Sequence, residues 1–203
     1  MIQTGSPPLI LASESASRQA LLHSAGITFT ARPAHIDEAS IKRSARAEGA
    51  TAENLAVLLA ELKATRISTV APEAVVIGAD QILLCDDIWF DKPASREQAR
   101  EHLRYLRGKM HSLVTAIVCM RSAGRLWHHI VQPRLTMRPF SDAFLEDYLA
   151  LEGDAVLSTV GAYRLEGPGV HLFERIEGEH SAILGLPLLP LFGFLRQHGV
   201  LGS

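Results

Sequence analysis

The apolar run at residues 75–84, VVIGADQILL, has the length and composition of a buried strand but contains one carboxylate, Asp80. Burying an unpaired carboxylate costs several kcal/mol, a large part of the roughly 5–15 kcal/mol that stabilises a typical domain. We therefore expect one of two arrangements. Either Asp80 meets a cation inside the protein, or it lies in water just past the strand end and caps a turn.

The hydrophobic pattern before this run predicts two strands and three helices, bounded by serine, aspartate and glycine signals. The elements are a strand at 8–12, a helix over 20–25 that stops at Gly26, a strand at 27–32, a helix from Asp37-Glu38 to near Gly49, and a helix over 51–65 packed through its leucines.

After the run, the pattern predicts further strands and helices separated by turns. They are a turn at Asp86-Asp87, a helix from the capping box Ser95/Gln98 to Gly108, a strand at 113–120, a hairpin at 122–124, a strand at 126–137, a helix over 141–153, a glycine-rich loop at 161–169, a strand at 170–176 and a last helix over 188–198. The order is that of an α/β fold, without internal repeats or an interdomain linker, and it does not by itself select one α/β fold from the others.

The segment after the first strand carries Ser13, Ser15, Ser17 and Arg18 just before a helix. A helix N-terminus offers free backbone N–H groups and the positive end of the helix dipole, which together suit a phosphate group. The alternative is that a serine only caps the helix, as serine usually does at this position. The adjacent Arg18 favours the phosphate site.

Four further charged residues are candidates for a site. Asp37 and Glu38 could cap the helix that they begin or hold a divalent cation. Lys63 lies at the margin of an apolar helical stripe, where its stem can be buried and its ammonium directed to an anion, or it is a surface side chain. Lys92 is held in extended backbone by Pro93, so its position is well defined.

Composition limits the classes of function. The chain of 203 residues is 47% hydrophobic and 21% charged, with a formal net charge of −2. This near-neutral balance argues against a general nucleic-acid or membrane-surface binder, and no apolar run reaches the roughly 20 residues of a membrane span. Cys85 and Cys119 lie in or beside strand-like runs, which is typical of structural buried thiols.

The motifs, taken in order, resemble those of the Maf family of nucleotide pyrophosphatases over nearly the full chain. They are LILASESASRQALL at 9–22, Asp37-Glu38, Lys63-Ala64, IGAD at 77–80, Lys92-Pro93, LRG at 106–108 with His111, GAY at 161–163 and GLP at 185–187. A single such motif would be weak, whereas the ordered set is specific.

The resemblance implies an enzyme, a hydrolase acting on acid anhydrides, that cleaves nucleoside triphosphates between the α and β phosphates and releases monophosphate and pyrophosphate. It also implies a mixed, bent sheet with helices around it and two lobes flanking a central cleft, formed by one domain over 1–203. A divalent metal, Mg²⁺ or Mn²⁺, a homodimer and a cytoplasmic location are expected on the same ground, with a house-cleaning role toward non-standard nucleotides.

The family positions assign roles to individual residues. Asp80 is expected to accept a proton from the attacking water and, with Glu38, to ligate the metal. Lys63, Lys92 and Arg18 would neutralise the charge that develops on the departing pyrophosphate. Ser13 and Ser15, with the N–H groups that follow, would hold phosphate oxygens.

Two positions concern the base. Gln81 and Glu166 form a pairing that is similar to the 7-methyl-GTP-cleaving branch of the family. An ionised glutamate can accept from the N1–H and the exocyclic amine of guanine and would repel the acceptor groups of pyrimidines. The alternative is that Glu166 is an exposed loop carboxylate.

Two departures from the family pattern leave the substrate open. Ser17 replaces one of two arginines, and Thr159 replaces a lysine. The other hypotheses are a dTTP- or UTP-preferring pyrophosphatase, a phosphatase or nucleotide-sugar enzyme, and a nucleotide-binding regulator of division or septum formation without turnover.

Overall fold

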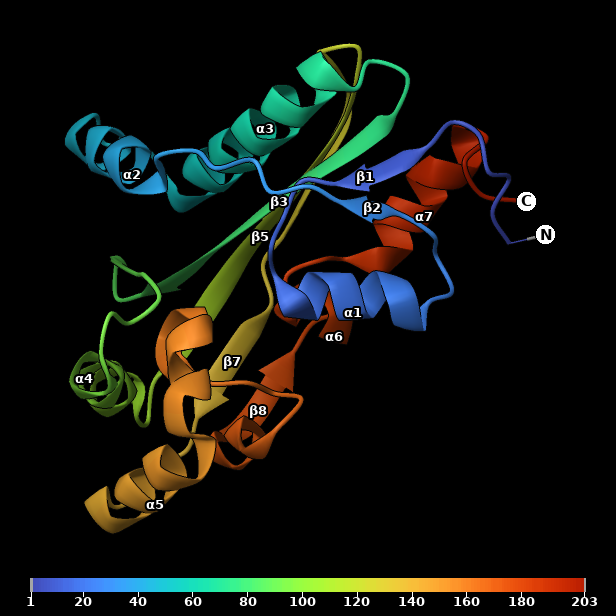
Figure 1. Ribbon diagram of the computed structural model, residues 1–203. Helices are drawn as coiled ribbons and strands as arrows, with labels where there is room; N and C mark the ends of the chain where they lie inside the picture. Colours follow the sequence, from blue (N-terminus) through green and yellow to red (C-terminus); the bar gives the residue numbers. More distant parts are fainter. Residues whose placement is uncertain (1, 203) are drawn as a thin grey trace. The chain divides into compact units, whose positions relative to one another are not determined.

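The computed structural model describes residues 2–202, which form an α/β fold around an eight-stranded mixed sheet (Figure 1). The strands are β1 Leu9–Leu11, β2 Thr30–Ala31, β3 Val75–Cys85, β4 Ile88–Phe90, β5 Met110–Arg121, β6 Gly124–Val131, β7 Arg134–Met137 and β8 Phe173–Glu177. The main path of the sheet is β2-β1-β3-β5-β7-β8, with β4 paired to β3 and β6 paired to β5. The predicted fold class is confirmed.

Seven α-helices and three short 3-10 helices connect these strands within the described part of the chain. They are α1 Ala16–Ser24, α2 Glu38–Ala47, α3 Ala52–Val70, α4 Arg96–Leu106, α5 Asp142–Glu152, α6 His180–Ile183 and α7 Leu188–Gln197, with η1 Gly153–Ser158, η2 Val160–Ala162 and η3 Pro168–Leu172.

The chain forms two compact units, each assembled from separate segments. Unit 1 takes in the chain up to Gln81, then Thr115–Val131 and the chain from Glu179 onward, and unit 2 consists of Ile82–Val114 and Gln132–Gly178. The single domain over 1–203 stays a prediction.

In unit 1, strand β1 pairs in parallel with β2 on one side and β3 on the other. Side chains alternate along a strand, so every second residue of β3 faces the same way. One face forms a core with β1, α1 and α7. Its fully buried members are Leu11, Leu22, Ile77, Ala79, Ile117, Cys119, Leu186, Leu191, Leu195 and Val200.

The other face of β3 lies against helix α3. A Cβ atom placed on Gly78 would be 2.0 Å from the carbonyl oxygen of Ala60 and 2.9 Å from the Cβ of Ala64, so only glycine permits this approach of helix and strand. Figure 1 shows α3 running along β3. The close contact fixes which residues of α3 face which residues of the strand.

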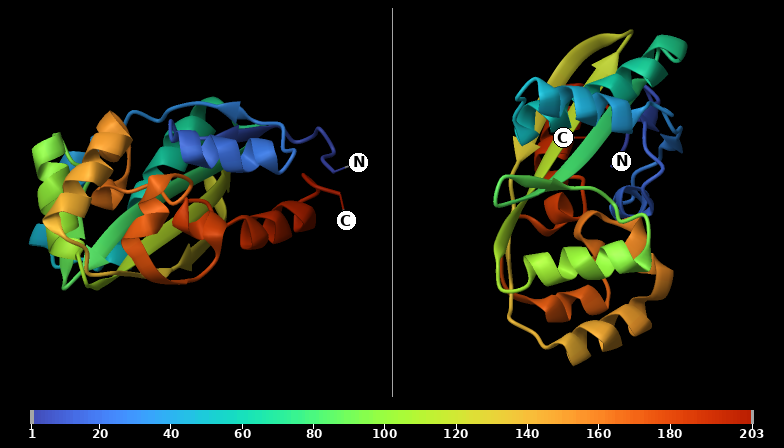
Figure 2. Two further views of the ribbon diagram at one scale, coloured as in Figure 1. Left: turned by 90° about the horizontal axis from the view of Figure 1, so that it is seen from below. Right: turned by 90° about the vertical axis from the view of Figure 1, so that its left-hand side faces the viewer.

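The two ends of the described chain meet within unit 1. Gln3 forms an isolated antiparallel bridge with Leu201, and the Thr4 N–H donates to the Val200 carbonyl at 3.1 Å. Both views of Figure 2 place these ends near each other.

Unit 2 contains the ends of β3 and β5, the hairpin strand β4, strands β7 and β8, helices α4 and α5, and the three 3-10 helices. Strand β7 pairs antiparallel with both β5 and β8. The core of unit 2 is apolar, and its fully buried members include Leu83, Leu103, Leu106, Leu135, Met137, Leu145 and Leu172.

Most predicted elements are confirmed, but three have bounds that differ from the structure, and two short elements, β4 and α6, were not predicted. The expected strand 126–137 divides into β6 and β7 at Pro133, which has no N–H for a ladder. Helix α3 continues to Val70, and within it the hydroxyls of Thr65 and Thr69 donate to carbonyls one turn earlier instead of competing with the helix. Strand β8 begins at Phe173 because residues 168–172 form η3, and the short helix α6 was not predicted.

Among residues 2–202, no helix combines the length and the apolar character that crossing a membrane requires.

Candidate active site

The carboxylate of Asp80 meets a buried lysine. Asp80 lies on the α3-facing side of β3, two residues after Gly78, and Lys63 lies three residues after Ala60 on α3. The Lys63 ammonium donates to Oδ1 of Asp80 at 2.6 Å, and the two side chains are 11% and 7% exposed. The alternatives of a solvated Asp80 and a surface Lys63 are therefore excluded.

The same ammonium reaches a second carboxylate. Lys63 Nζ lies 2.7 Å from Oε1 of Glu38, at the start of helix α2. Burial alone would raise the pKa of Glu38, but the charge and hydrogen bond of Lys63, with Lys42 and Arg18 behind it, hold that pKa below its usual value. Asp37 instead caps α2, accepting from the Ser40 N–H at 3.0 Å. The two neighbouring carboxylates thus have different roles.

The second oxygen of Asp80, Oδ2, is buried and has no hydrogen-bond partner within residues 2–202. An unsatisfied buried carboxylate oxygen is costly, so it marks a place where a ligand would be stabilised. Oxygen donors suit Mg²⁺ and Mn²⁺, which commonly bind one or two carboxylates together with substrate phosphates. Asp80 and Glu38 fit such a cation, although the described chain has no cluster of three or more acidic, His or Cys side chains suited to a metal.

Ser15 is the N-cap of α1, accepting from the Arg18 N–H at 3.4 Å. Ser13 precedes the helix, and its Oγ accepts both from the Ser15 N–H and from Nη1 of Arg18, each at 3.2 Å. Ser15 therefore has the capping role that serine usually has at this position. Ser13 is buried beside the guanidinium, so it belongs to a polar, positively charged segment at the helix N-terminus.

The guanidinium of Arg18 ties together three distant segments of unit 1. Besides Ser13, it donates through Nη1 to the Ala79 carbonyl and through Nε to the Gly185 carbonyl, both at 2.9 Å. Burial lowers the pKa of Arg18, while the carboxylates of Asp80 and Glu38 oppose that shift, and a guanidinium in a protein stays charged. Arg18 thus places a positive charge next to Asp80.

Gln81 points to the face of β3 opposite Asp80. Its Nε2 donates to Thr115 Oγ1 at 2.8 Å and to the carbonyls of Ala182 and Ile183, both at 3.1 Å. Its amide donors are therefore used inside unit 1, where they join β3, β5 and the end of α6.

Two of the predicted site residues, Lys92 and Glu166, belong to unit 2. Lys92 is exposed and precedes the buried Pro93. Glu166 is exposed in the glycine-rich loop, at the third position of a turn closed by a 3.2 Å hydrogen bond from the Gly167 N–H to the Arg164 carbonyl.

An ion pair that was not predicted from the sequence supports this loop. Glu152, whose side chain is fully buried, accepts from Nε and Nη2 of Arg164 at 2.9 and 3.3 Å. The spacing of Leu145, Tyr148, Leu149 and Glu152 on α5 is that of one helical face, which could have shown that Glu152 is buried.

Two motif residues without an expected role also contact each other. Nε2 of His111 lies 2.8 Å from the hydroxyl of Tyr163, and Nδ1 of His111 is buried without a partner among the described residues. Burial lowers the pKa of His111 to about 4. Thr159, which replaces a family lysine, donates its hydroxyl to the Tyr163 carbonyl at 2.8 Å. It closes the start of the loop.

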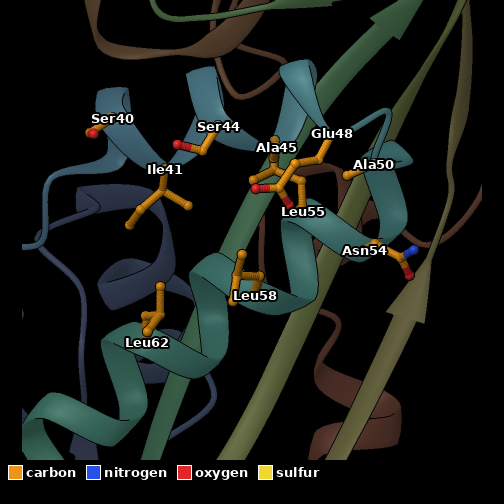
Figure 3. A pocket seen from close by; sticks show the side chains of 10 residues that line it. All are labelled: Ser40, Ile41, Ser44, Ala45, Glu48, Ala50, Asn54, Leu55, Leu58 and Leu62. Carbon is orange, nitrogen blue, oxygen red and sulfur yellow. The ribbon is translucent and has the colours of Figure 1, made fainter.

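A separate groove of about 340 Å³ lies between helices α2 and α3 (Figure 3). Its lining is mostly apolar with a few polar groups, and consists of Ser40, Ile41, Ser44, Ala45, Glu48, Ala50, Asn54, Leu55, Leu58 and Leu62. None of the predicted site residues lines it.

Comparisons with known proteins identify the family of the chain. A family model described as Maf-like protein matches residues 8–198, so the chain belongs to the Maf family. It is 55% identical to a nucleoside triphosphate pyrophosphatase of Granulibacter bethesdensis, covering 95% of this chain and 98% of the relative. It is 54% identical to a protein of the same name from Rhodospirillum rubrum, covering 97% and 98%. A 7-methyl-GTP pyrophosphatase of Rhizobium meliloti is 46% identical, covering 97% and 99%.

Proposed function

We propose that this enzyme hydrolyses nucleoside triphosphates at the bond between the α phosphorus and the bridging oxygen, giving a nucleoside monophosphate and pyrophosphate. The observation that carries the proposal is the buried Lys63 between Asp80 and Glu38, with one oxygen of Asp80 left unsatisfied. The chain is a nucleoside triphosphate pyrophosphatase, a hydrolase acting on acid anhydrides, as are relatives more than 50% identical over almost their whole length.

Asp80 acts as the general base. Its unsatisfied Oδ2 is the acceptor that takes a proton from the attacking water, while Oδ1 stays bonded to Lys63. The water oxygen attacks the α phosphorus, and the bridging oxygen leaves with pyrophosphate. Because Lys63 holds Oδ1, the carboxylate keeps one orientation throughout the reaction.

Cationic side chains balance the charge of the triphosphate. Lys63, Arg18 and Lys92 neutralise the negative charge that moves onto the leaving pyrophosphate, which is the main requirement of phosphate transfer. Ser13, Ser15 and the N-terminal N–H groups of α1 hold phosphate oxygens. A divalent cation, Mg²⁺ or Mn²⁺, held by Glu38 and Asp80, would supply further charge neutralisation.

The proposed base preference is for guanine of the 7-methyl-GTP type. Glu166 is an exposed acceptor on a defined turn, and an ionised carboxylate can accept two hydrogen bonds from guanine but none from the carbonyl groups of uracil. The 46% identical relative with that name supports the preference. Gln81 is proposed to contribute through its carbonyl oxygen, because its amide nitrogen is bonded within unit 1.

Product analysis across a nucleotide panel tests the proposal. The protein is incubated with GTP, 7-methyl-GTP, UTP, dTTP and ATP, with Mg²⁺, Mn²⁺ or EDTA, and products are resolved by anion-exchange chromatography. We expect monophosphate and pyrophosphate, loss of turnover in EDTA, and the highest kcat/KM for 7-methyl-GTP. Diphosphate with orthophosphate would overturn the cleavage site, and tight binding without turnover with either metal would instead favour a regulator.

The assembly and location of the enzyme stay predictions. A homodimer is checked by light scattering coupled to size-exclusion chromatography, and the cytoplasmic location by fractionation of the source cells.

A further inference from the structure

The carbonyl groups at the end of helix α6 are held by side chains from two strands of the sheet. The Ala182 carbonyl accepts from Gln81 Nε2 and from Thr115 Oγ1, each at 3.1 Å. The Ile183 carbonyl accepts from the same Gln81 nitrogen, also at 3.1 Å. Because carbonyl oxygens only accept, the amide atom of Gln81 that faces them is its nitrogen. Thr115 is fully buried, so it can affect a ligand only through its neighbours.

The turn after α6 holds Arg18 through the backbone of Gly185. The Gly185 N–H donates to the Ala182 carbonyl at 3.0 Å, and the Gly185 carbonyl accepts from Arg18 Nε at 2.9 Å. Gly185 has a φ of +94°, a left-handed conformation that favours glycine, and a Cβ atom there would lie 3.1 Å from Arg18 Nε. The position of the Gly185 carbonyl, and of the guanidinium bonded to it, therefore depends on how the Ala182 carbonyl is held.

These bonds form a closed hydrogen-bond ring that begins and ends on β3. It links the Ala79 carbonyl to the side chain of Gln81, two residues further along the strand, through Arg18, Gly185 and Ala182. Nε and Nη1 of Arg18 donate to groups of the protein, whereas no hydrogen bond within residues 2–202 uses Nη2. Since a guanidinium is planar and rigid, fixing Nε and Nη1 also fixes the direction of Nη2.

We propose that Gln81 and Thr115 are positioning residues for Arg18: by holding the end of α6, they direct Nη2 of the guanidinium to the pyrophosphate part of the substrate. This inference rests on the proposed role of Arg18 at the departing pyrophosphate. A guanidinium aimed at a phosphate oxygen forms a strong, charge-assisted hydrogen bond, and a small displacement weakens it. The effect concerns the phosphate groups, so it is the same for every nucleotide and extends to pyrophosphate itself.

The affinity for pyrophosphate tests the proposal, because pyrophosphate carries no base. Its Kd is measured by calorimetry at a fixed Mg²⁺ concentration and does not depend on turnover. We expect Gln81→Met, which lacks the amide donor, to raise this Kd about tenfold, and Thr115→Val to raise it about threefold. Thr115→Ser keeps the hydroxyl and should bind pyrophosphate within about twofold of the wild type. With GTP and UTP, Thr115→Val should raise both KM values by the same factor.

A double variant shows whether Gln81 acts through Arg18. Arg18→Met removes the donor and should raise the Kd for pyrophosphate about 10- to 100-fold. Gln81→Met/Arg18→Met should match Arg18→Met within about twofold, because no guanidinium remains to be positioned. The matched control is Ser68→Ala. Ser68 is buried on α3 in the same unit and accepts from the Ala123 N–H at 3.0 Å, so its loss removes a buried hydroxyl outside the ring and should leave the Kd unchanged.

Each other result overturns the inference. A folded Gln81→Met protein with the wild-type Kd would do so, as would a double variant that binds pyrophosphate more weakly than Arg18→Met by the full effect of Gln81→Met. If Gln81→Met does not fold, the comparison of Thr115→Val with Thr115→Ser decides. An unchanged Kd in Arg18→Met would remove the contact of Arg18 with pyrophosphate, and this inference with it, while monophosphate and pyrophosphate as products still supported the proposed function.

Discussion

Asp80 binds the Lys63 ammonium through Oδ1 at 2.6 Å, while its equally buried Oδ2 has no partner within residues 2–202. One carboxylate thus combines a structural bond with an open acceptor. The bonded oxygen fixes the orientation of the group, and the open one can contact water or a ligand. This division lets stability and chemistry be tested separately.

Replacing the acceptor tests the chemistry. Asp80→Asn keeps the shape of the side chain but removes its basicity, so we expect kcat to fall by a factor of about 10² to 10⁴, the usual contribution of a general base. Pyrophosphate release from the preferred nucleotide measures the effect. Retention of more than a tenth of wild-type kcat would contradict the assignment of Asp80 as the base.

Removing the lysine tests the buried charge. Lys63→Met leaves Asp80 without its bonded cation, and we expect the free energy of unfolding to fall by about 3–5 kcal/mol, as for other broken buried pairs. Denaturant titration followed by circular dichroism gives the value. Lys109→Met, which breaks the exposed pair with Asp86, is the control and should have little effect.

A double variant checks the origin of that loss. Lys63→Met/Asp80→Asn removes both partners. Its loss in the free energy of unfolding should therefore be smaller than the sum of the losses in the two single variants. Strict additivity would mean that the two side chains do not stabilise each other.

A glycine-to-alanine pair tests the contact of β3 with α3. Gly78→Ala would press a methyl group into the Ala60 carbonyl, and we expect it to reduce stability by about 3 kcal/mol and to impair turnover, because α3 carries Lys63. Gly193→Ala in α7 meets no atom within 4 Å and should be neutral or stabilising by up to about 1 kcal/mol. Equal stabilities for the two variants would refute the role of Gly78.

The buried His111 predicts a pH dependence of stability. Its pKa is about 4 in the folded protein and near 6.5 when unfolded, so between these values the unfolded chain binds more protons. The contribution of His111 to the free energy of unfolding is fully present above about pH 6.5. It is lost as the pH falls toward 4, and the total loss is about 3 kcal/mol. Unfolding curves recorded from pH 7 to 4 give the free energy of unfolding at each pH. This free energy should change less with pH for His111→Gln than for the wild type. The same dependence of the unfolding free energy on pH in both proteins would contradict the lowered pKa of His111.

Much of unit 1 could be predicted because its signals are local. The carboxylate in an apolar run indicated a cation, and Lys63 at the edge of the leucine stripe was a candidate for it. Their actual meeting depends on Gly78, which brings α3 against β3, and no periodicity in the sequence reports that distance. Arg18 was expected to face phosphate, whereas its bonds to the Ala79 and Gly185 carbonyls depend on tertiary contacts alone.

The glycine-rich loop was harder to predict because its path also depends on contacts between residues that are distant in the sequence. Its glycines indicated an unusual path, but the reason for Gly167 and Gly169 is the closeness of Arg164 and Glu152, which lie on different elements. Pro133 shows the opposite case. Its effect on the strand is local, and the break between β6 and β7 could have been inferred from the missing N–H.

The contacts of Arg18 determine when the segment around it can complete its folding. Its guanidinium contacts carbonyls 61 and 167 positions further along the chain. During synthesis the segment with Ser13 emerges long before the one with Gly185, so a nascent chain cannot complete this set of contacts. The segment with Ser13 acquires its final form only when the last part of the polypeptide docks, which makes the proposed phosphate site one of the latest features of folding.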